Sequence, residues 1–316
     1  MKPTTSQAVA FGHEMATYLS AYRHRLDDYN WGMTESCIAA ARARGLRSDR
    51  DFGGDFAETL ELRQAVAQRS REIQAGKKGA TRVQELADLA KFVISDWGGL
   101  NGNDEETIEE YASRFTDIET GFDAVVDHES LRLAVRPRIR RGLYRFGGIA
   151  SWSKWLSFVW NDWALIYDAR IAFALDAIHF IRSVNAPVLP VPPGRNGLLA
   201  SLDDESAAAF AWLGSYGSAC PARDELVAAS VGKTSKDDPL RVWLNTAVVP
   251  GQNAYAYYLE VMAAAHRQLW QDDRPLVHTE MLLFKISIAE IAQDFIAEML
   301  ARFGQLPEGA ALAEAA

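Results

Sequence analysis

Apolar residues recur at helical spacing along most of this 316-residue chain, and this periodicity restricts the fold more than any other feature of the sequence. Towards the C-terminus the stripe is formed by Met281, Phe284, Ile288, Ile291, Phe295 and Leu300. An alternating pattern typical of a β-strand competes with the helical one only at Val188–Val191. We therefore expect an all-α fold.

The periodicity, together with N-cap and glycine signals, predicts where the helices lie. Thr34, Thr81, Asp104 and Asp168 precede or open helical patterns and are the candidate N-caps. The predicted helices cover Phe11–Arg44 with a second start at Thr34, Asp55–Gln74, a segment from Thr81, Asp104–Phe115, Asp117–Asp127, Ile149–Trp160, Ala169–Ile181, Asp203–Gly214, Arg223–Val231, Ala254–Trp270 and Thr279–Phe303.

A proline-rich segment, PVLPVPPG at residues 187–194, is the best candidate for a crossover between two parts of the molecule. Such a sequence is stiff and extended. We expect an N-terminal helical lobe over residues 1–186, a C-terminal helical lobe over 195–306 and a frayed tail over 307–316.

Hydrophobic residues make up 48% of the chain and charged residues 24%, which is typical of a soluble globular protein. No apolar run is long enough for a membrane helix, and the N-terminus lacks a signal-peptide core, so we expect a cytoplasmic protein. Cys37 and Cys220 have no metal-ligand spacing and are interpreted as core thiols. The sequence indicates no metal, no cofactor and no obligatory protein partner.

One basic segment stands out in a protein of net charge −9. Between Leu131 and Arg182 there are nine basic and three acidic side chains, and the basic residues include the run Arg136, Arg138, Arg140, Arg141 and Arg145. Overall acidity argues against general nucleic-acid binding, because phosphate neutralisation needs a positive surface. The local excess of arginine is nevertheless suited to gripping phosphates.

The segment Gly147–Ser183 follows this run and holds four of the nine tryptophans, together with Lys154. Burial and neighbouring arginines such as Arg140 and Arg145 would favour a neutral, nucleophilic amine at Lys154. The competing interpretation is a lysine that extends from a helix surface into solvent.

Asp168 stands where a strongly apolar helix begins. A carboxylate there accepts backbone N–H bonds and faces the positive end of the helix dipole. Capping alone would explain the residue. The same position also keeps a carboxylate ionised in apolar surroundings, which suits a group that stabilises a developing sugar oxocarbenium ion.

The glycine- and asparagine-rich segment Asp96–Asn103 has two interpretations. Glycines allow close backbone approach to a ligand, and Asn101 could hydrogen-bond a base edge. The segment could equally be a helix C-cap and tight turn, with Trp97 buried.

The motif SKWLSF at residues 153–158, followed by IYDARIA at 166–172, resembles that of bacterial proteins related to 8-oxoguanine DNA glycosylase. More distantly it is similar to the helix-hairpin-helix DNA glycosylase superfamily. The resemblance covers about 40 residues, and GGIASWS precedes the lysine in place of a hairpin glycine motif. It implies a two-lobed helical fold with the active site in the cleft between the lobes.

On this resemblance Lys154 is the candidate amine nucleophile and Asp168 the essential carboxylate. Arg170, beside the cap, is placed to contact a phosphate. The partner is then double-stranded DNA carrying a modified base, which flips into a pocket walled by aromatic residues. The expected pocket residues are Trp97, Asn101, Trp152, Trp155, Trp163 and Tyr167.

The resemblance implies an oxidised purine as the base. A bulky modified base, such as those that protect phage DNA, is a second substrate class and would give the enzyme an anti-phage role. AP-lyase activity depends on whether Lys154 or water attacks the sugar. Two other functions remain open: a non-catalytic DNA-binding protein with a glycosylase-like fold, and an acidic helical protein whose arginines contact carboxylates of a protein partner.

Overall fold

The computed structural model describes residues 4–31, 33–46, 54–113, 145–192, 228–229, 231–232 and 248–303. Within these ranges the structure is helical, and the only β-type pairings are the isolated bridges Asn30–Asp55 and Val188–Val248. The all-α prediction is therefore confirmed for the described part of the chain. No helix in these ranges has the length and apolar composition needed to cross a membrane.

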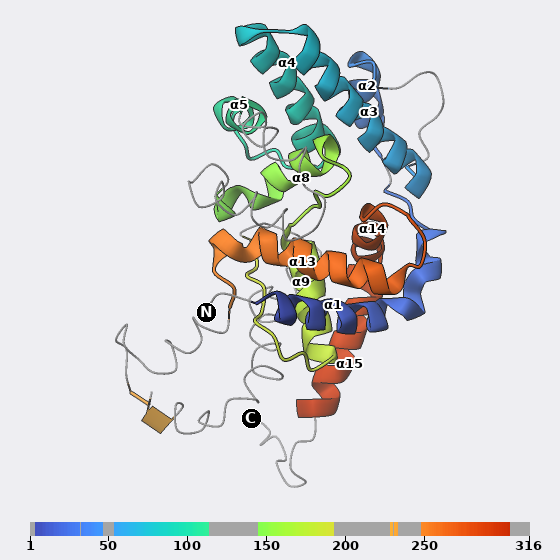
Figure 1. Ribbon diagram of the computed structural model, residues 1–316, viewed down its shortest axis with the longest axis vertical. Helices are drawn as coiled ribbons and strands as arrows, with labels where there is room; N and C mark the ends of the chain where they lie inside the picture. Colours follow the sequence, from blue (N-terminus) through green and yellow to red (C-terminus); the bar gives the residue numbers. More distant parts are fainter. Residues whose placement is uncertain are drawn as a thin grey trace, which may run out of the picture.

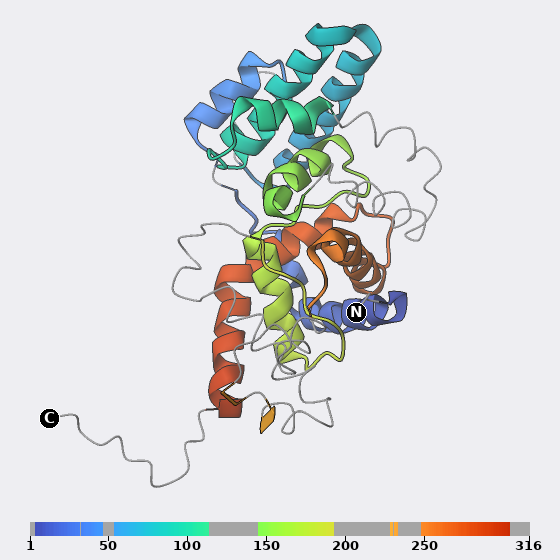
Figure 2. The same ribbon diagram turned by 90° about the vertical axis from the view of Figure 1, so that its left-hand side faces the viewer.

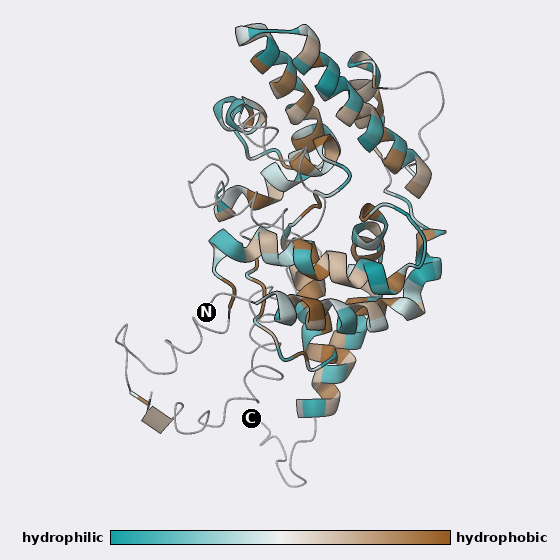
Figure 3. Ribbon diagram, viewed as in Figure 1, coloured by the Kyte–Doolittle hydropathy of each residue, from teal (hydrophilic) through white to brown (hydrophobic). Residues whose placement is uncertain are grey.

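One group of helices forms the upper part of the molecule in Figure 1. It contains α2 (Glu35–Ala43), α3 (Phe56–Gly76), α4 (Gly79–Lys91), the π-helix η2 (Phe92–Trp97) and α5 (Glu105–Ser113). The helix α8 (Ile149–Val159) packs beneath them against α3 and η2 and is preceded by the short turn η3 (Phe146–Gly148). Figure 3 shows hydrophilic and hydrophobic residues mixed along α3 and α4, as expected of helices that cover a core with one face.

A second group lies below and unites both ends of the described chain. It consists of α1 (Thr5–Leu19), η1 (Ser20–Leu26), α9 (Ala169–Ile181), α13 (Gly251–Leu269), α14 (Val277–Ile286), the π-helix η5 (Ser287–Ile291) and α15 (Ala292–Phe303). The helix α1 packs along α13, and α9 runs beside α15 (Figure 2). Helices from both sides of the proline-rich segment thus share one core.

Close packing of α1 on α13 depends on a glycine. A Cβ atom at Gly12 would lie 2.5 Å from the Cβ of Ala264 and 2.6 Å from the carbonyl oxygen of Val261. A Cβ atom would overlap both of these atoms, and the overlap could be relieved only by moving a helix backbone. Only glycine therefore allows the two helices to approach this closely.

The chain crosses between the two groups at residues 27–34 and again at 160–168. The second crossing begins with a turn at 161–163 and continues without regular secondary structure to Asp168, and its residues 164–167 are buried. Because it ends at Asp168, the geometry of this crossing decides where that carboxylate lies.

Most predicted helix boundaries lie within a few residues of the observed ones. The predicted caps Thr34 and Asp104 accept hydrogen bonds from the backbone N–H groups of Cys37 and Thr107, respectively. Asp55, which was expected only as the first residue of a helix, caps α3 by accepting from the Glu58 N–H. Cys37 is buried, as expected of a core thiol. Predictions for residues 117–127 and 203–214, for most of 223–231 and for Cys220 fall outside the described residues.

Three boundary predictions are wrong. Thr81 lies inside α4, which begins at Gly79 because the turn at Gly76–Gly79 already reverses the chain. The helix expected from Phe11 begins at Thr5, capped by Thr4, and the pattern up to Arg44 is broken between η1, which ends at Leu26, and α2, which begins at Glu35. The stripe from Thr279 to Phe303 belongs to three successive elements, because η5 inserts a π-helical turn between α14 and α15.

Asp176 is fully buried in the middle of α9. Its Oδ1 atom accepts a hydrogen bond from the Leu189 backbone at 3.3 Å, whereas Oδ2 has no hydrogen-bond partner. Burial raises the pKa of Asp176 well above its ordinary value, and the Leu189 hydrogen bond opposes this shift only in part. The folded protein therefore favours the protonated form of this carboxyl more strongly than the unfolded chain does.

We predict that Asp176→Asn stabilises the protein at neutral pH. Because the folded-state pKa is raised, the unfolded chain loses its proton first, and wild-type stability falls as pH rises from about 4 towards the folded-state pKa. The variant keeps the acceptor for Leu189 but cannot ionise. Chemical denaturation at pH 4, 6 and 8 should show a variant advantage that grows with pH. An equal loss of stability at every pH would contradict the prediction.

Candidate functional site

Lys154 and Asp168 meet where the upper and lower helix groups join. Lys154 comes from the middle of α8, and Asp168 stands immediately before α9. The Lys154 Nζ atom donates to Asp168 Oδ2 at 3.0 Å. Only 5% of the lysine side chain and 17% of the aspartate side chain are exposed, so this is a largely desolvated ion pair with one open edge at the carboxylate.

The pair discriminates between the two interpretations of Lys154. A lysine extending into solvent would be exposed, whereas this side chain is buried among the aromatic residues of α8. The described residues do not show the arginines that were expected next to Lys154 and that would have favoured its neutral amine. The charged partner of Lys154 is Asp168, Arg145 is exposed, and Arg136, Arg138, Arg140 and Arg141 lie outside the described residues.

Asp168 performs the capping role that its position predicts. Its backbone is extended, and Oδ1 accepts a hydrogen bond from the Ile171 N–H at 3.1 Å. Burial acts to raise the pKa of this carboxyl, but the Lys154 charge and the Ile171 hydrogen bond outweigh it, so that the pKa lies below its ordinary value. Asp168 is thus held ionised and is a weak base at neutral pH.

Side chains from distant elements satisfy the buried backbone that leads to Asp168. The Tyr255 hydroxyl donates to Leu165 O at 2.9 Å and accepts from Leu165 N at 3.2 Å. The Ser153 hydroxyl likewise accepts from the Tyr167 N–H at 3.0 Å and donates to the Tyr167 carbonyl oxygen at 3.4 Å. Residues 165 and 167 therefore have no buried backbone group left without a partner, as a non-helical core segment requires.

Ile166, between them, is held by a buried charge. Its N–H donates to Glu280 Oε2 at 2.8 Å, and its carbonyl accepts from the Tyr258 hydroxyl at 2.8 Å. The other Glu280 oxygen binds Arg63 Nη2 at 2.6 Å, and both side chains are at most 2% exposed. Arg63 also lies over the Phe158 ring, 5.2 Å from its centre. This network connects α3, α14 and the crossing segment.

The glycine-bearing turn after η2 packs directly on the lysine. A Cβ atom at Gly98 would lie 2.8 Å from Lys154 Cδ and 2.7 Å from Ile94 O. Further along, Asn103 donates to the Ser151 hydroxyl of α8 at 3.0 Å. The segment Asp96–Asn103 is therefore both a helix end with Trp97 buried and a turn that confines Lys154. Asn101, the residue expected to read a base, is exposed.

The predicted aromatic residues are mainly core side chains. Trp97, Trp152, Trp155 and Tyr167 are at most 4% exposed, whereas Trp163 is half-buried beside Trp160. Trp97 stacks on Trp31 with ring centres 4.9 Å apart, and Trp152 meets the edge of Tyr255 at 4.8 Å. The Tyr167 hydroxyl donates to Pro190 O at 2.7 Å. These contacts hold the aromatic side chains in the core rather than at an open surface.

Arg170 is engaged inside the protein. Its Nε donates to the Ser287 hydroxyl and its Nη2 to Phe284 O, both at 2.6 Å, and the guanidinium lies 3.8 Å from the centre of the Phe284 ring. Burial lowers the pKa of Arg170, while Asp168 acts in the opposite direction. These hydrogen bonds join α9 to α14 and η5, so a phosphate would have to compete with them.

Sequence patterns did not single out Arg63, Ser153, Tyr255, Tyr258 or Glu280. Glu280 interrupts an apolar stripe, which is the one available signal that a charge is buried there. The search for known relatives gives no further guidance, because no family model, curated protein or solved structure matches this chain. The candidate site therefore depends on its own geometry.

We predict that Gly98→Ala displaces Lys154 and destabilises the protein by about 1–3 kcal/mol, because the new methyl group would overlap the lysine stem and a fixed carbonyl oxygen. Gly102→Ala is the matched control, since a Cβ atom there meets nothing within 4 Å. Denaturant unfolding of both variants provides the measurement. Equal stability of the two variants would show that the turn does not confine Lys154.

Proposed function

We propose that the chain is a DNA glycosylase that excises a modified base through Asp168 and Lys154. The observation that carries the proposal is the ion pair itself: an amine and a capping carboxylate, fourteen positions apart in sequence, meet at 3.0 Å between two helices. The motif resemblance assigns the chemistry to the same two residues. The proposed active site lies in a cleft between a lobe formed by the upper helices and a lobe formed by the lower ones.

The properties of Asp168 suit one step in particular. When the N-glycosidic bond breaks, its electron pair leaves with the base, and positive charge develops on the deoxyribose. A carboxylate kept ionised by Lys154 and by a helix N-terminus stabilises that charge. Because its lowered pKa makes it a weak base, electrostatic stabilisation is a better role for Asp168 than proton abstraction.

The role of Lys154 distinguishes two mechanisms of base release, in which either its amine or water attacks the sugar. If its amine, once deprotonated, adds to C1′ of the sugar, opening of the sugar ring gives a Schiff base, which borohydride reduces to a stable protein–DNA adduct. If water adds instead, the base is released without an adduct. The proposed substrate is an oxidised purine or a bulky modified base, and the second would give the enzyme an anti-phage role. The arginine run at 136–145 is proposed to bind the DNA phosphates.

One observation favours a second candidate function. Lys154 and Asp168 bind each other, and Arg170 is hydrogen-bonded within the protein, which is the arrangement expected of a non-catalytic DNA-binding protein that retains a glycosylase-like structure. Such a protein would bind DNA with a steep salt dependence and leave it unaltered.

We predict that Asp168→Asn abolishes base release, at least about a hundredfold by analogy with removal of an electrostatic catalytic group, while the protein remains folded. Asparagine is also a preferred N-cap, so the substitution removes the charge and keeps the cap. Asp162→Asn, at an exposed position in the turn that begins the crossing segment, is the matched control. The assay presents duplexes carrying 8-oxoguanine, alkylated bases, uracil or hypermodified cytosines and measures released base by mass spectrometry.

Retained release by Asp168→Asn would exclude the carboxylate assignment. Release of no base, combined with salt-dependent binding that survives the substitution, would favour the DNA-binding alternative.

For Lys154→Ala, we expect loss of the borohydride adduct. Lys91→Ala, at an exposed lysine, should leave it intact. An adduct that persists in Lys154→Ala would assign the nucleophile to another residue.

A further inference from the structure

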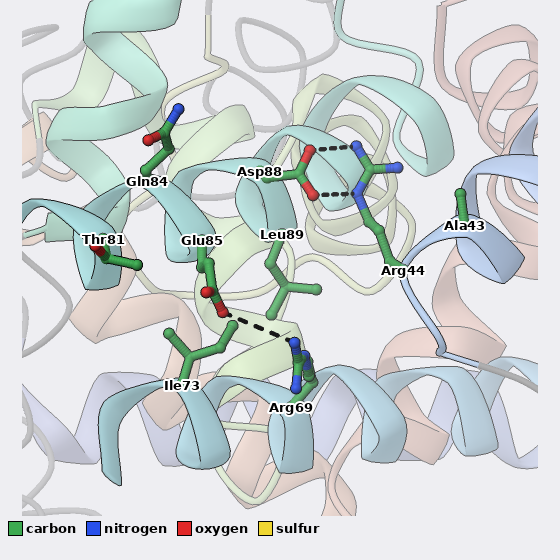
Figure 4. A pocket seen from close by; sticks show the side chains of 9 residues that line it. All are labelled: Ala43, Arg44, Arg69, Ile73, Thr81, Gln84, Glu85, Asp88 and Leu89. Carbon is green, nitrogen blue, oxygen red and sulfur yellow. Dashed lines mark hydrogen bonds and ion pairs between the residues drawn. The ribbon is translucent and has the colours of Figure 1, made fainter. Parts of the chain in front are cut away.

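A second site lies in the upper helix group, on residues that the Lys154–Asp168 site does not use. A pocket of about 460 Å³ opens between α2, α3 and α4 (Figure 4). This volume falls within the range of about 300–1,000 Å³ typical of small-molecule sites.

One wall of the pocket is a closed ion pair. Arg44 donates to both oxygens of Asp88, from Nε at 2.9 Å and from Nη2 at 2.7 Å. Its remaining terminal nitrogen donates to Ala40 O at 3.0 Å and lies 3.4 Å from Asp96. The donors of Arg44 are thus satisfied within the protein, so we expect this wall to shape the pocket without recognising a ligand's charge.

The opposite wall is an open ion pair. Glu85 on α4 faces Arg69 on α3 (Figure 4), but the closest nitrogen–oxygen distance is 3.7 Å. Glu85 Oε1 contacts Lys77 Nζ at 3.1 Å, while Oε2 is buried and makes no hydrogen bond. A buried carboxylate oxygen without a donor is an unmet acceptor. Arg69 is 46% exposed, and its other carboxylate contact, with Glu72, is 3.4 Å long.

Between the two walls the pocket is apolar. Ile73 and Leu89 are 3% and 2% exposed, respectively, and Ala43 completes this surface. Thr81 and Gln84 add uncharged polar groups. The pocket thus joins an apolar surface to an adjacent anion and cation, neither of which has its full set of hydrogen bonds.

We propose that this pocket binds a small zwitterion with an apolar substituent, of the α-amino-acid type. The ammonium group donates to the Glu85 carboxylate, which is 30% exposed. The ligand carboxylate accepts from the Arg69 guanidinium, and the apolar side chain packs on Ile73, Leu89 and Ala43. Because an α-amino acid carries its ammonium and carboxylate groups on the same carbon atom, its two charges match the adjacent Glu85 and Arg69. A simple anion would provide no hydrogen-bond donor for Glu85, and a simple cation would provide no acceptor for Arg69.

Isothermal titration calorimetry of the full-length chain tests the proposal with L-phenylalanine and L-leucine as probes. N-acetyl-L-phenylalanine removes the ammonium charge, L-phenylalaninamide removes the carboxylate charge, and inorganic phosphate tests for a plain anion site. The protein variants are Glu85→Gln and Arg69→Gln. Arg71→Gln, at an exposed arginine on the same helix that does not line the pocket, is the matched control.

We expect at least one of the two amino acids to bind with a Kd below about 1 mM, and both analogues and both pocket variants to weaken this binding by at least about tenfold. Arg71→Gln should bind like the wild type. Because the analogues are tested on the unaltered protein, the outcome does not depend on how a variant folds. No binding of either amino acid, equal binding of the analogues, binding unaffected by both pocket substitutions, or equal binding of phosphate would each overturn the proposal.

Discussion

The structure depends on a stretch of non-helical backbone inside a helical core. Residues 165–167 cannot satisfy their N–H and C=O groups with one another, and each buried group left without a partner would cost about 1–3 kcal/mol. Tyr255, Ser153, Tyr258 and Glu280 supply all the missing partners. Because these side chains come from α8, α13 and α14, the segment can be stable only when all three helices are in place.

Glu280 also makes this arrangement depend on a buried ion pair. Its carboxylate is desolvated, and Arg63 is the cation that neutralises it. Breaking such a pair from one side leaves an uncompensated buried charge, at a cost of about 3–5 kcal/mol. Arg63 belongs to the upper helices and Glu280 to the lower ones, so the pair also fixes the two groups relative to each other. Lys154 and Asp168 meet across the same junction, two residues beyond Ile166.

Local sequence signals were sufficient for the elements that carry the site. Helical spacing and the cap residue predicted α9 over Ala169–Ile181 with Asp168 in front of it, and the structure has the same bounds. They were sufficient because a cap acts within one turn of helix. Thr81 shows the limit of this reasoning: a good capping residue remains inside a helix when the turn before it already starts the helix.

Long-range partners could not be predicted in this way. No spacing rule connects Ser153 to Tyr167, Tyr255 to Leu165 or Arg63 to Glu280, because these pairs are set by how the helices pack. The motif resemblance selected Lys154 and Asp168, but it did not indicate that they would form a closed pair. The same packing explains why most of the predicted pocket aromatics are buried: they fill the core around the pair.

The central claim is that this packing holds an ionised Asp168 against Lys154. Its most direct test is the titration of the Asp168 carboxyl carbon by NMR, in wild-type protein and in Lys154→Met. The account predicts a pKa below the usual range of an aspartate in the wild type, and a clear upward shift in the variant, where burial remains and the neighbouring charge is lost. An ordinary pKa that does not change between the two proteins would contradict it.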